Sequence, residues 1–387
     1  MRFLILFLPL LLSPVAGWSQ NTVDLAEWSK KIEWAGDLRY RFAKAKESID
    51  DERSYQQLRA RLGVRADVNE NTQAVIRFAT GSSAISTNQT LGDAKDPGMP
   101  RRTFGLDLGY IDWTFAKGGK IWAGRAANPF WSPAKVQTVF DSDLAFEGLA
   151  VKWEPKWSAS SAFVNLGGFI ISENFDSPYD VVDTGIAAAE IGYSQKTPIG
   201  TLTGRVGTYH FLNIQDKQIN AVEKDGKVDA YSYPFDRYRG NTVYPNDPLA
   251  APDQRKYYFQ NKYVLQAMGL EWKHKIGPIE PALFYEIVKN TEVDDQNTAV
   301  EYGFAAKWGR TSLSWAFIEK QTDSIVGTFT DSDTNGGGTD NKGTRLSLAY
   351  QLSDNSLVGF NQFRATRGVH SVSRDYTGSQ LDFVVSF

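Results

Sequence analysis

The stretch "QLRARLGVRADV", residues 57–68, alternates apolar and polar side chains along its length. Leu58, Leu62 and Val64 lie on its apolar face, whereas Arg59 and Arg61 lie on its polar face. Strict alternation of this kind is typical of a β-strand with one apolar and one polar side. The stretch is longer than the usual five or six residues of a strand. It fits the tilted strands of about 9–11 residues that cross a bilayer.

The same period recurs along the chain, for example in "LRYRF" (38–42), "VEYGFAAKW" (300–308) and "RLSLAYQL" (345–352). We predict sixteen strands, of which the fifth, seventh and tenth alternate poorly. They cover residues 35–44, 55–68, 72–80, 103–115, 120–127, 144–153, 158–170, 184–195, 200–211, 257–273, 278–289, 298–308, 311–320, 343–352, 356–366 and 378–387. In the fourth of these the apolar face changes side, and a β-bulge near Tyr110 would restore the alternation.

The connections between these strands are alternately short and long. Short links such as "NENT" (69–72) and "KGGK" (117–120) take turns with long ones such as 81–102 and 212–256. Bacterial outer-membrane barrels have an even strand number, short periplasmic turns and long extracellular loops. Only a closed barrel pairs the backbone of every lipid-exposed strand. We therefore predict an all-β fold, a transmembrane antiparallel β-barrel of about 16 strands over residues 35–387.

Composition alone would allow another interpretation. Mean hydropathy is −0.37, cysteine is absent and the net charge is −3, which is compatible with a soluble periplasmic β protein. Aromatic residues make up 13% of the chain, and several occupy strand ends on the apolar face. An interfacial girdle explains that placement better than core packing does. Its predicted members are Trp153, Tyr193, Trp272, Trp308, Tyr350 and Phe387.

The two ends of the chain carry their own signals. Residues 1–19, "MRFLILFLPLLLSPVAGWS", pair one cation with a short apolar run, which predicts a secretory signal peptide that is removed. Residues 20–34 would then be a short periplasmic segment. The chain ends on "LDFVVSF" (381–387), which we interpret as the sixteenth strand, with Phe387 at the periplasmic interface.

Arginines gather on the polar faces of the early strands. A charge on the lipid face would cost roughly 2–4 kcal/mol at the midplane, so these residues are expected to face water in any case. A functional alternative is an anion-attracting wall in a pore. Arg205 and Arg345 share the polar face, and the predicted basic wall consists of Arg39, Arg41, Arg59, Arg61, Arg65, Arg77 and Arg125.

The third long loop, "NPFWSPAKVQTVFDSDLAFEG" (128–148), is rich in aromatic residues. We predict that it folds into the lumen and narrows it, so that its acidic side chains face the basic wall. Packing on the rim, or a Ca²⁺ site at Asp141 and Asp143, are alternatives, although this pair supplies few ligands. The predicted constriction residues are Phe130, Trp131, Asp141, Asp143 and Glu147.

Several of these stretches resemble the putative porin family of Gram-negative outer membranes. The resemblance rests on "RLGVRADVNENTQAVIRFATGSSAISTNQTLGD" (61–93), "LDLGYIDWTF" (106–115), and "ANPFW" followed by "FDSDLAFEG". It implies a water-filled channel for small hydrophilic solutes, related in architecture to general and anion-selective porins, which are often trimers. It also implies contacts with outer-membrane lipids and lipopolysaccharide. Phe383, Val385 and Phe387 resemble the C-terminal signal that the outer-membrane barrel assembly machinery recognises.

The sequence gives little support to other chemistry. His210, His274 and His370 are far apart, so neither a catalytic triad nor a metal site emerges. We expect no catalytic residue, no metal, no cofactor and no nucleic-acid partner. The predicted function is passive diffusion through an outer-membrane homotrimer, with a weak anion preference. A substrate-selective channel, a barrel enzyme or an adhesive barrel remain alternatives.

Overall fold

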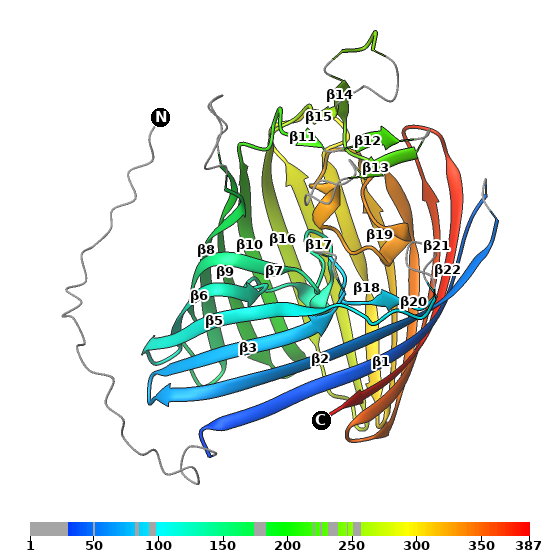
Figure 1. Ribbon diagram of the computed structural model, residues 1–387. Coiled ribbons are helices and arrows are strands. Elements are labelled where there is room, and N and C mark those ends of the chain that lie inside the picture. Colours follow the sequence, from blue (N-terminus) through cyan, green and yellow to red (C-terminus); the bar gives the residue numbers. More distant parts are fainter. Residues whose placement is uncertain are drawn as a thin grey trace, which may run out of the picture.

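The computed structural model describes residues 30–48, 51–81, 85–92, 98–173, 183–219, 221–224, 227–230, 239–245, 247–250 and 257–387. Sixteen antiparallel strands form one closed barrel (Figure 1). In barrel order they are β1 (Ile32–Glu47), β2 (Arg53–Asn69), β3 (Thr72–Thr80), β5 (Phe104–Ala116), β6 (Gly119–Ala127), β7 (Ala145–Trp153), β8 (Ser160–Ser172), β9 (Thr184–Thr197), β10 (Gly200–Leu212), β16 (Tyr263–Lys273), β17 (Ile279–Asn290), β18 (Thr298–Trp308), β19 (Thr311–Lys320), β20 (Asn341–Ser353), β21 (Ser356–Arg367) and β22 (Arg374–Ser386). The predicted fold class and strand number are confirmed.

The last strand closes the barrel by pairing with the first. The register of β1 against β22 runs from Asp37 opposite Ser386 to Glu47 opposite Tyr376. Two backbone hydrogen bonds between Gly36 and Phe387, of 2.8 and 3.0 Å, continue this ladder to the final residue. The aromatic C-terminus is therefore part of the seam that closes the barrel.

The strands start earlier or end later than predicted at several places. β1 begins at Ile32, so residues 32–34 belong to the barrel. The predictions for residues 1–19 and 20–29 lie outside the described residues. The predicted strand 257–273 divides in two, because β15 (Tyr257–Phe259) pairs in a separate small sheet with β11 (Gln218–Ile219) and β14 (Val243–Pro245).

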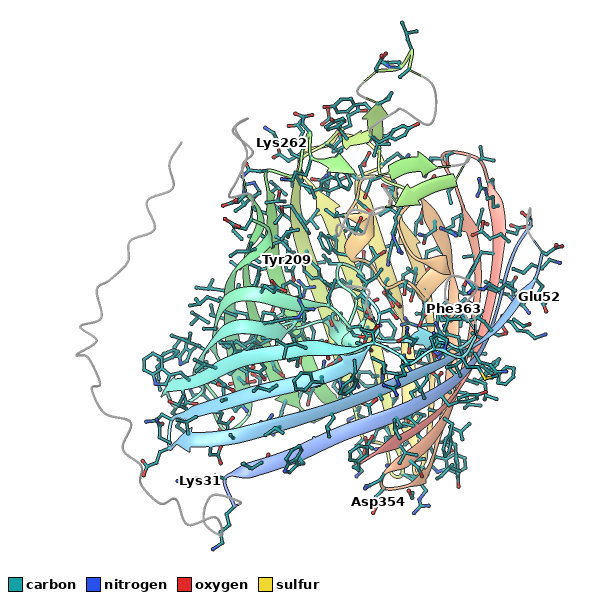
Figure 2. The ribbon with its side chains drawn as sticks, viewed as in Figure 1. Lys31, Glu52, Tyr209, Lys262, Asp354 and Phe363 are labelled. Atoms are coloured by element: carbon teal, nitrogen blue, oxygen red, sulfur yellow. The ribbon has the colours of Figure 1, made fainter. Side chains whose placement is uncertain are left out.

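The two ends of the barrel differ as predicted. Seven tight turns lie at one end, where Figure 2 places Asp354, and the long loops lie at the other, beside Lys262. The small sheet of β11, β14 and β15 and the hairpin of β12 (Ala221–Lys224) and β13 (Lys227–Ala230) lie beyond this loop end (Figure 1). By the rule for bacterial barrels, the turn end faces the periplasm.

Alternation along the strands sorts apolar side chains to the outside. On β22, Leu381 and Phe383 are 50% and 46% exposed, whereas Asp382 between them is buried. At the turn end the predicted girdle residues are likewise exposed, except for Trp272, which is half-buried and donates to the carbonyl of Ile199 at 2.8 Å. An apolar outer band, with the charged side chains of the strands turned away from it, is the arrangement that a lipid environment requires.

The predicted bulge exists, but at a different residue. Arg77 and Phe78 of β3 pair with Leu108 and Leu106 of β5, which leaves Asp107 as the extra residue. From Leu108 onward the apolar and polar faces of β5 exchange sides, as bulges allow. The bulge lies at Asp107 rather than near Tyr110, because Leu108 already points to the barrel interior, where it is buried.

The hydrophobic core lies inside the barrel. It joins aromatic residues of the third loop, residues 128–144, to buried residues of β7–β10 and β15–β18 and to the seventh loop, residues 321–340. Its largest members are Phe130, Phe140, Phe146, Phe169, Tyr209, Phe211, Phe259, Tyr263 and Phe329. This half of the interior is filled, which leaves the open lumen to the other half. Among the helices of the described segments, none has the length and apolarity to cross a membrane.

Candidate functional site in the barrel lumen

The third loop folds into the barrel, as predicted, and aromatic contacts hold it there. The rings of Phe130 and Tyr209 meet edge to face with centroids 5.1 Å apart, and Phe140 meets Phe146 in the same way at 5.0 Å. Figure 2 shows Tyr209 midway between the two ends of the barrel. Edge-to-face pairs add about 0.5–1.5 kcal/mol each beyond area burial. The loop is thus packed against the wall rather than against the rim.

Carboxylates of the wall also hold the loop backbone. Glu190 accepts a hydrogen bond from the backbone N–H of Trp131 at 2.9 Å, and Glu271 accepts from that of Ala134 at 2.5 Å. Glu301 accepts from the hydroxyl of Thr138 at 3.2 Å. Between these anchors lies a 3₁₀ turn, η1 (Pro133–Lys135), in which Ala134 and Lys135 adopt positive φ of 48° and 60°. Such conformations persist only where the surroundings over-determine them.

A buried ion cluster lies behind the loop. Arg205 of β10 pairs with Glu286 of β17 and lies 3.5 Å from Glu190 of β9, and it donates to the hydroxyl of Tyr209 at 3.1 Å. The side chains of Arg205, Glu190 and Glu286 are at most 2% exposed. Glu190 also accepts a hydrogen bond from the loop backbone. The ion cluster therefore helps to hold the third loop in place.

The open lumen consists of two adjoining cavities. The larger, about 860 Å³, reaches the turn end at Lys196, Lys275 and Lys307. The smaller, about 290 Å³, lies between the third and seventh loops and the walls of β1 and β2. The residues that line both cavities mark the level where they meet: Arg39, Ser314, Arg345, Ser347 and Asn361.

Much of the predicted basic wall is neutralised in place. Arg41 makes a bidentate pair with Asp382, at 2.6 and 2.9 Å, and a further bond of 2.5 Å to Asp333. Arg59 and Arg61 share the carboxylate of Asp37, with contacts of 2.6 to 3.0 Å. Bidentate pairing of this type is both strong and directional.

The remaining arginines of the wall are spread along the lumen. Arg77 bonds to Asp107 at 2.6 Å, and Arg65 lies at the turn end, 3.7 Å from Glu33. Arg345, which was not among the predicted residues of the basic wall, donates a hydrogen bond to Glu301 at 2.9 Å.

The predictions for Arg125 and Glu147 were wrong. Arg125 stands opposite Gly109 and Glu147, on the face where Ile111 and Leu149 are 54% and 50% exposed. The two charged residues pair with each other on the outer surface near the loop end. A charge there costs less than at the midplane, and the opposite charge of the partner lowers the cost further. Glu147 is also part of β7 rather than of the third loop.

Four aspartates face the lumen from the two loops. Asp141 and Asp143 belong to the third loop, Asp331 and Asp333 belong to the seventh loop, and all four line the smaller cavity. Asp141 accepts hydrogen bonds from the backbone N–H groups of Asp143 and Ser332, at 2.8 and 3.4 Å. Burial, and then the neighbouring carboxyl of Asp331, raises the pKa of Asp141 to about 8. The lining of this cavity includes five cationic and four acidic side chains, so opposite charges face each other across it.

The other predicted loop residues have supporting positions. Phe130 belongs to the aromatic core, and Trp131 packs against Phe163 of β8 at 5.8 Å, so neither lines the smaller cavity. Sequence reasoning missed the seventh loop and the row of inward glutamates on β9, β16, β17 and β18. A single acid at an inward position of successive apolar strands, as in "AAAEIGY" around Glu190, is the signal that would have revealed this row. No three His, Cys, Asp or Glu side chains of the described segments are grouped so as to hold a metal ion.

A sixteen-stranded antiparallel barrel with an apolar outer band and a loop that narrows a polar lumen defines a porin-type channel of the outer membrane. A family model described as "Putative porin" matches residues 44–294 and 305–387. The chain belongs to this family, which makes it an outer-membrane channel for small solutes.

Solved structures agree on the fold. Salmonella typhi OmpF aligns at a TM-score of 0.52 with 10% identity, over 92% of this chain and 97% of that one. Pseudomonas putida OprB aligns at 0.51 with 12% identity, over 94% and 95%, and a trimer form of Vibrio cholerae OmpT at 0.50 with 10% identity, over 92% and 99%. At these identities the similarity concerns the fold alone. A search of curated protein sequences finds no match.

Proposed function

We propose that the protein is a passive diffusion channel for small hydrophilic solutes and ions, with a weak anion preference. The observation that carries this proposal is the pair of adjoining cavities inside the barrel, which share Arg39 and Arg345 as lining residues. A protein that only adhered to surfaces would have no need of adjoining cavities inside the barrel.

The balance of charges supports a weak rather than a strong preference. Each carboxylate on the wall occupies guanidinium groups that would otherwise attract anions: Asp382 holds Arg41, and Asp37 holds Arg59 and Arg61. The excess of cations in the smaller cavity is therefore small, and selectivity in pores follows the charges that line the constriction.

Planar-bilayer recording of the folded protein tests the proposal. Stable open-channel steps in potassium chloride are expected, with a reversal potential in a salt gradient that shows chloride to be modestly more permeable than potassium. A silent bilayer with correctly folded protein would refute channel function, and potassium preference would refute the anion preference.

We further propose a homotrimer that contacts lipids and lipopolysaccharide, after export through an N-terminal signal peptide. The trimer form of the Vibrio cholerae structure supports this assembly by similarity of fold. Recognition of Phe383, Val385 and Phe387 by the barrel assembly machinery is also a proposal. It is supported by the place of Phe387 in the closing seam. Cross-linking of membranes, followed by mass measurement of the complex, tests the trimer.

A further inference from the structure

Arg39 differs from every other arginine of the lumen. Arg41, Arg59, Arg61, Arg65, Arg77, Arg205 and Arg345 each have a carboxylate within 4.0 Å. Among the described residues, Arg39 has none: the one hydrogen bond of its guanidinium goes to the neutral side-chain oxygen of Asn88, and its buried Nε has no partner.

The strand register explains why Arg39 is left without an anion. Arg39 of β1 stands directly opposite Arg59 of β2, and like charges at such positions repel each other. The carboxylates of Asp382 and Asp37 on the same wall are already bound by other guanidinium groups. A half-buried cation in this position gains from any anion that enters the lumen.

A second cation faces the same space from the third loop. Lys135 is exposed and lines the smaller cavity together with Arg39, and its side-chain ammonium makes no hydrogen bond or ion pair within the described residues. Its backbone holds a positive φ between anchored neighbours, so the position of the residue is fixed by the loop rather than by its own preference. Arg39 also lines the larger cavity, so a solute passing from one cavity to the other meets it.

We propose that Arg39 and Lys135 form a binding subsite for small singly charged carboxylates in the smaller cavity, which meets the larger cavity at Arg39. This rests on the proposed channel function and names a solute class for it. The planar guanidinium matches the two oxygens of a carboxylate, and Lys135 adds a second charge. The carboxylate of Asp143 lines the same cavity and opposes ions of higher negative charge, such as the phosphate dianion.

Permeability ratios in planar bilayers test the subsite. Reversal potentials are measured in gradients of potassium acetate and of potassium phosphate, for the full chain and for Arg39→Gln and Lys135→Gln. We expect each substitution to lower the acetate-to-potassium ratio by roughly threefold to tenfold, since a unit charge at contact distance in water acts on that scale. The phosphate ratio should change less.

Two matched controls separate the site from its surroundings. Arg65→Gln removes the same charge from the same wall at the turn end, and should leave the acetate ratio within about twofold. Asn88→Ala removes the one side-chain partner of Arg39 and keeps its charge, so acetate preference should persist. An equal loss in Arg65→Gln, or a larger effect on phosphate than on acetate, would overturn the proposal.

A second readout does not depend on conduction. Phenylglyoxal modifies accessible arginines, and acetate should slow the modification of Arg39 in the folded, detergent-purified protein but not that of Arg65. If bilayers stay silent and this protection is seen, the channel function fails while the subsite holds. If bilayers conduct and acetate neither protects Arg39 nor depends on it, the subsite fails while the channel function holds.

Discussion

Substitution of Arg205 by methionine should destabilise the barrel strongly. The guanidinium pairs with Glu286, lies 3.5 Å from Glu190 and donates to Tyr209. Methionine fills a similar volume but offers no donor, so two carboxylates with side chains at most 2% exposed would lose their cation. Removing one partner of a buried ion cluster typically costs about 3–5 kcal/mol, because it leaves an uncompensated charge.

The assay is urea unfolding of the protein in lipid vesicles, followed by tryptophan fluorescence. We expect Arg205→Met to lower the free energy of unfolding by about 3–5 kcal/mol. Adding Glu286→Gln should recover about 1–3 kcal/mol, because the orphan carboxylate becomes a neutral amide. Arg65→Met is the control: its pair with Glu33 is 3.7 Å long and half-exposed, and such pairs contribute about 0–1 kcal/mol.

Unfolding of Arg205→Met at the urea concentration of the wild type, or a double variant less stable than the single one, would contradict a stabilising role of the Arg205 ion cluster. Loss of Arg205 should also loosen the third loop, since Glu190 holds the backbone N–H of Trp131. Open-channel current noise should therefore rise in Arg205→Met and remain unchanged in the control.

Three further predictions concern the constriction and the closing seam. Raising the pH from 6 to 9 should lower the chloride-to-potassium permeability ratio, which is measured as a shift in reversal potential. The reason is that burial and Asp331 raise the pKa of Asp141 to about 8, so that its carboxyl gains its charge in that interval. Asp141→Asn should abolish this shift. At pH 7, Asp143→Asn should shift the reversal potential toward anions, and an unchanged value would place Asp143 outside the conducting path. Deletion of Phe387 should reduce the amount of assembled barrel in membranes. Gly36→Val should do the same, since a Cβ at Gly36 would lie 2.6 Å from the Phe387 ring. Heat-modifiable mobility on gels measures the assembled fraction of each variant, and a normal fraction would contradict the prediction.

The raised pKa of Asp141 also makes the stability of the folded protein depend on pH. The pKa of Asp141 lies above its ordinary value of 3.8, so the folded state holds its proton more tightly than the unfolded state. The docking of the third loop is therefore strongest at low pH and weakens as the pH rises from about 4 toward about 8, where the carboxyl ionises beside Asp331.

Strand number, barrel closure and the inward third loop could be predicted because each depends on a period or a composition visible along the chain. Alternation with period two fixes which side of a strand meets lipid, and a lipid surface tolerates few exceptions. The bulge at Asp107 shows the limit. The change of face in β5 was visible in the sequence, but the residue that is left over depends on the register with β3, which no single strand reveals.

The sequence predicts that arginines line the lumen, but it does not predict which of them remain there without a carboxylate partner. Arg39 and Arg125 show the reason. Both are arginines at strand positions, and the sequence offered no ground for treating them differently. Register decides between them: Arg125 meets Glu147 across β6 and β7 on the outer surface, whereas Arg39 meets Arg59 inside the lumen. The charges that a solute would encounter in the lumen therefore depend on which strands are neighbours. In a closed barrel, where β1 pairs with β22, this includes residues from opposite ends of the chain, so Asp382 removes Arg41 from the free basic wall and leaves Arg39 as its unpaired member.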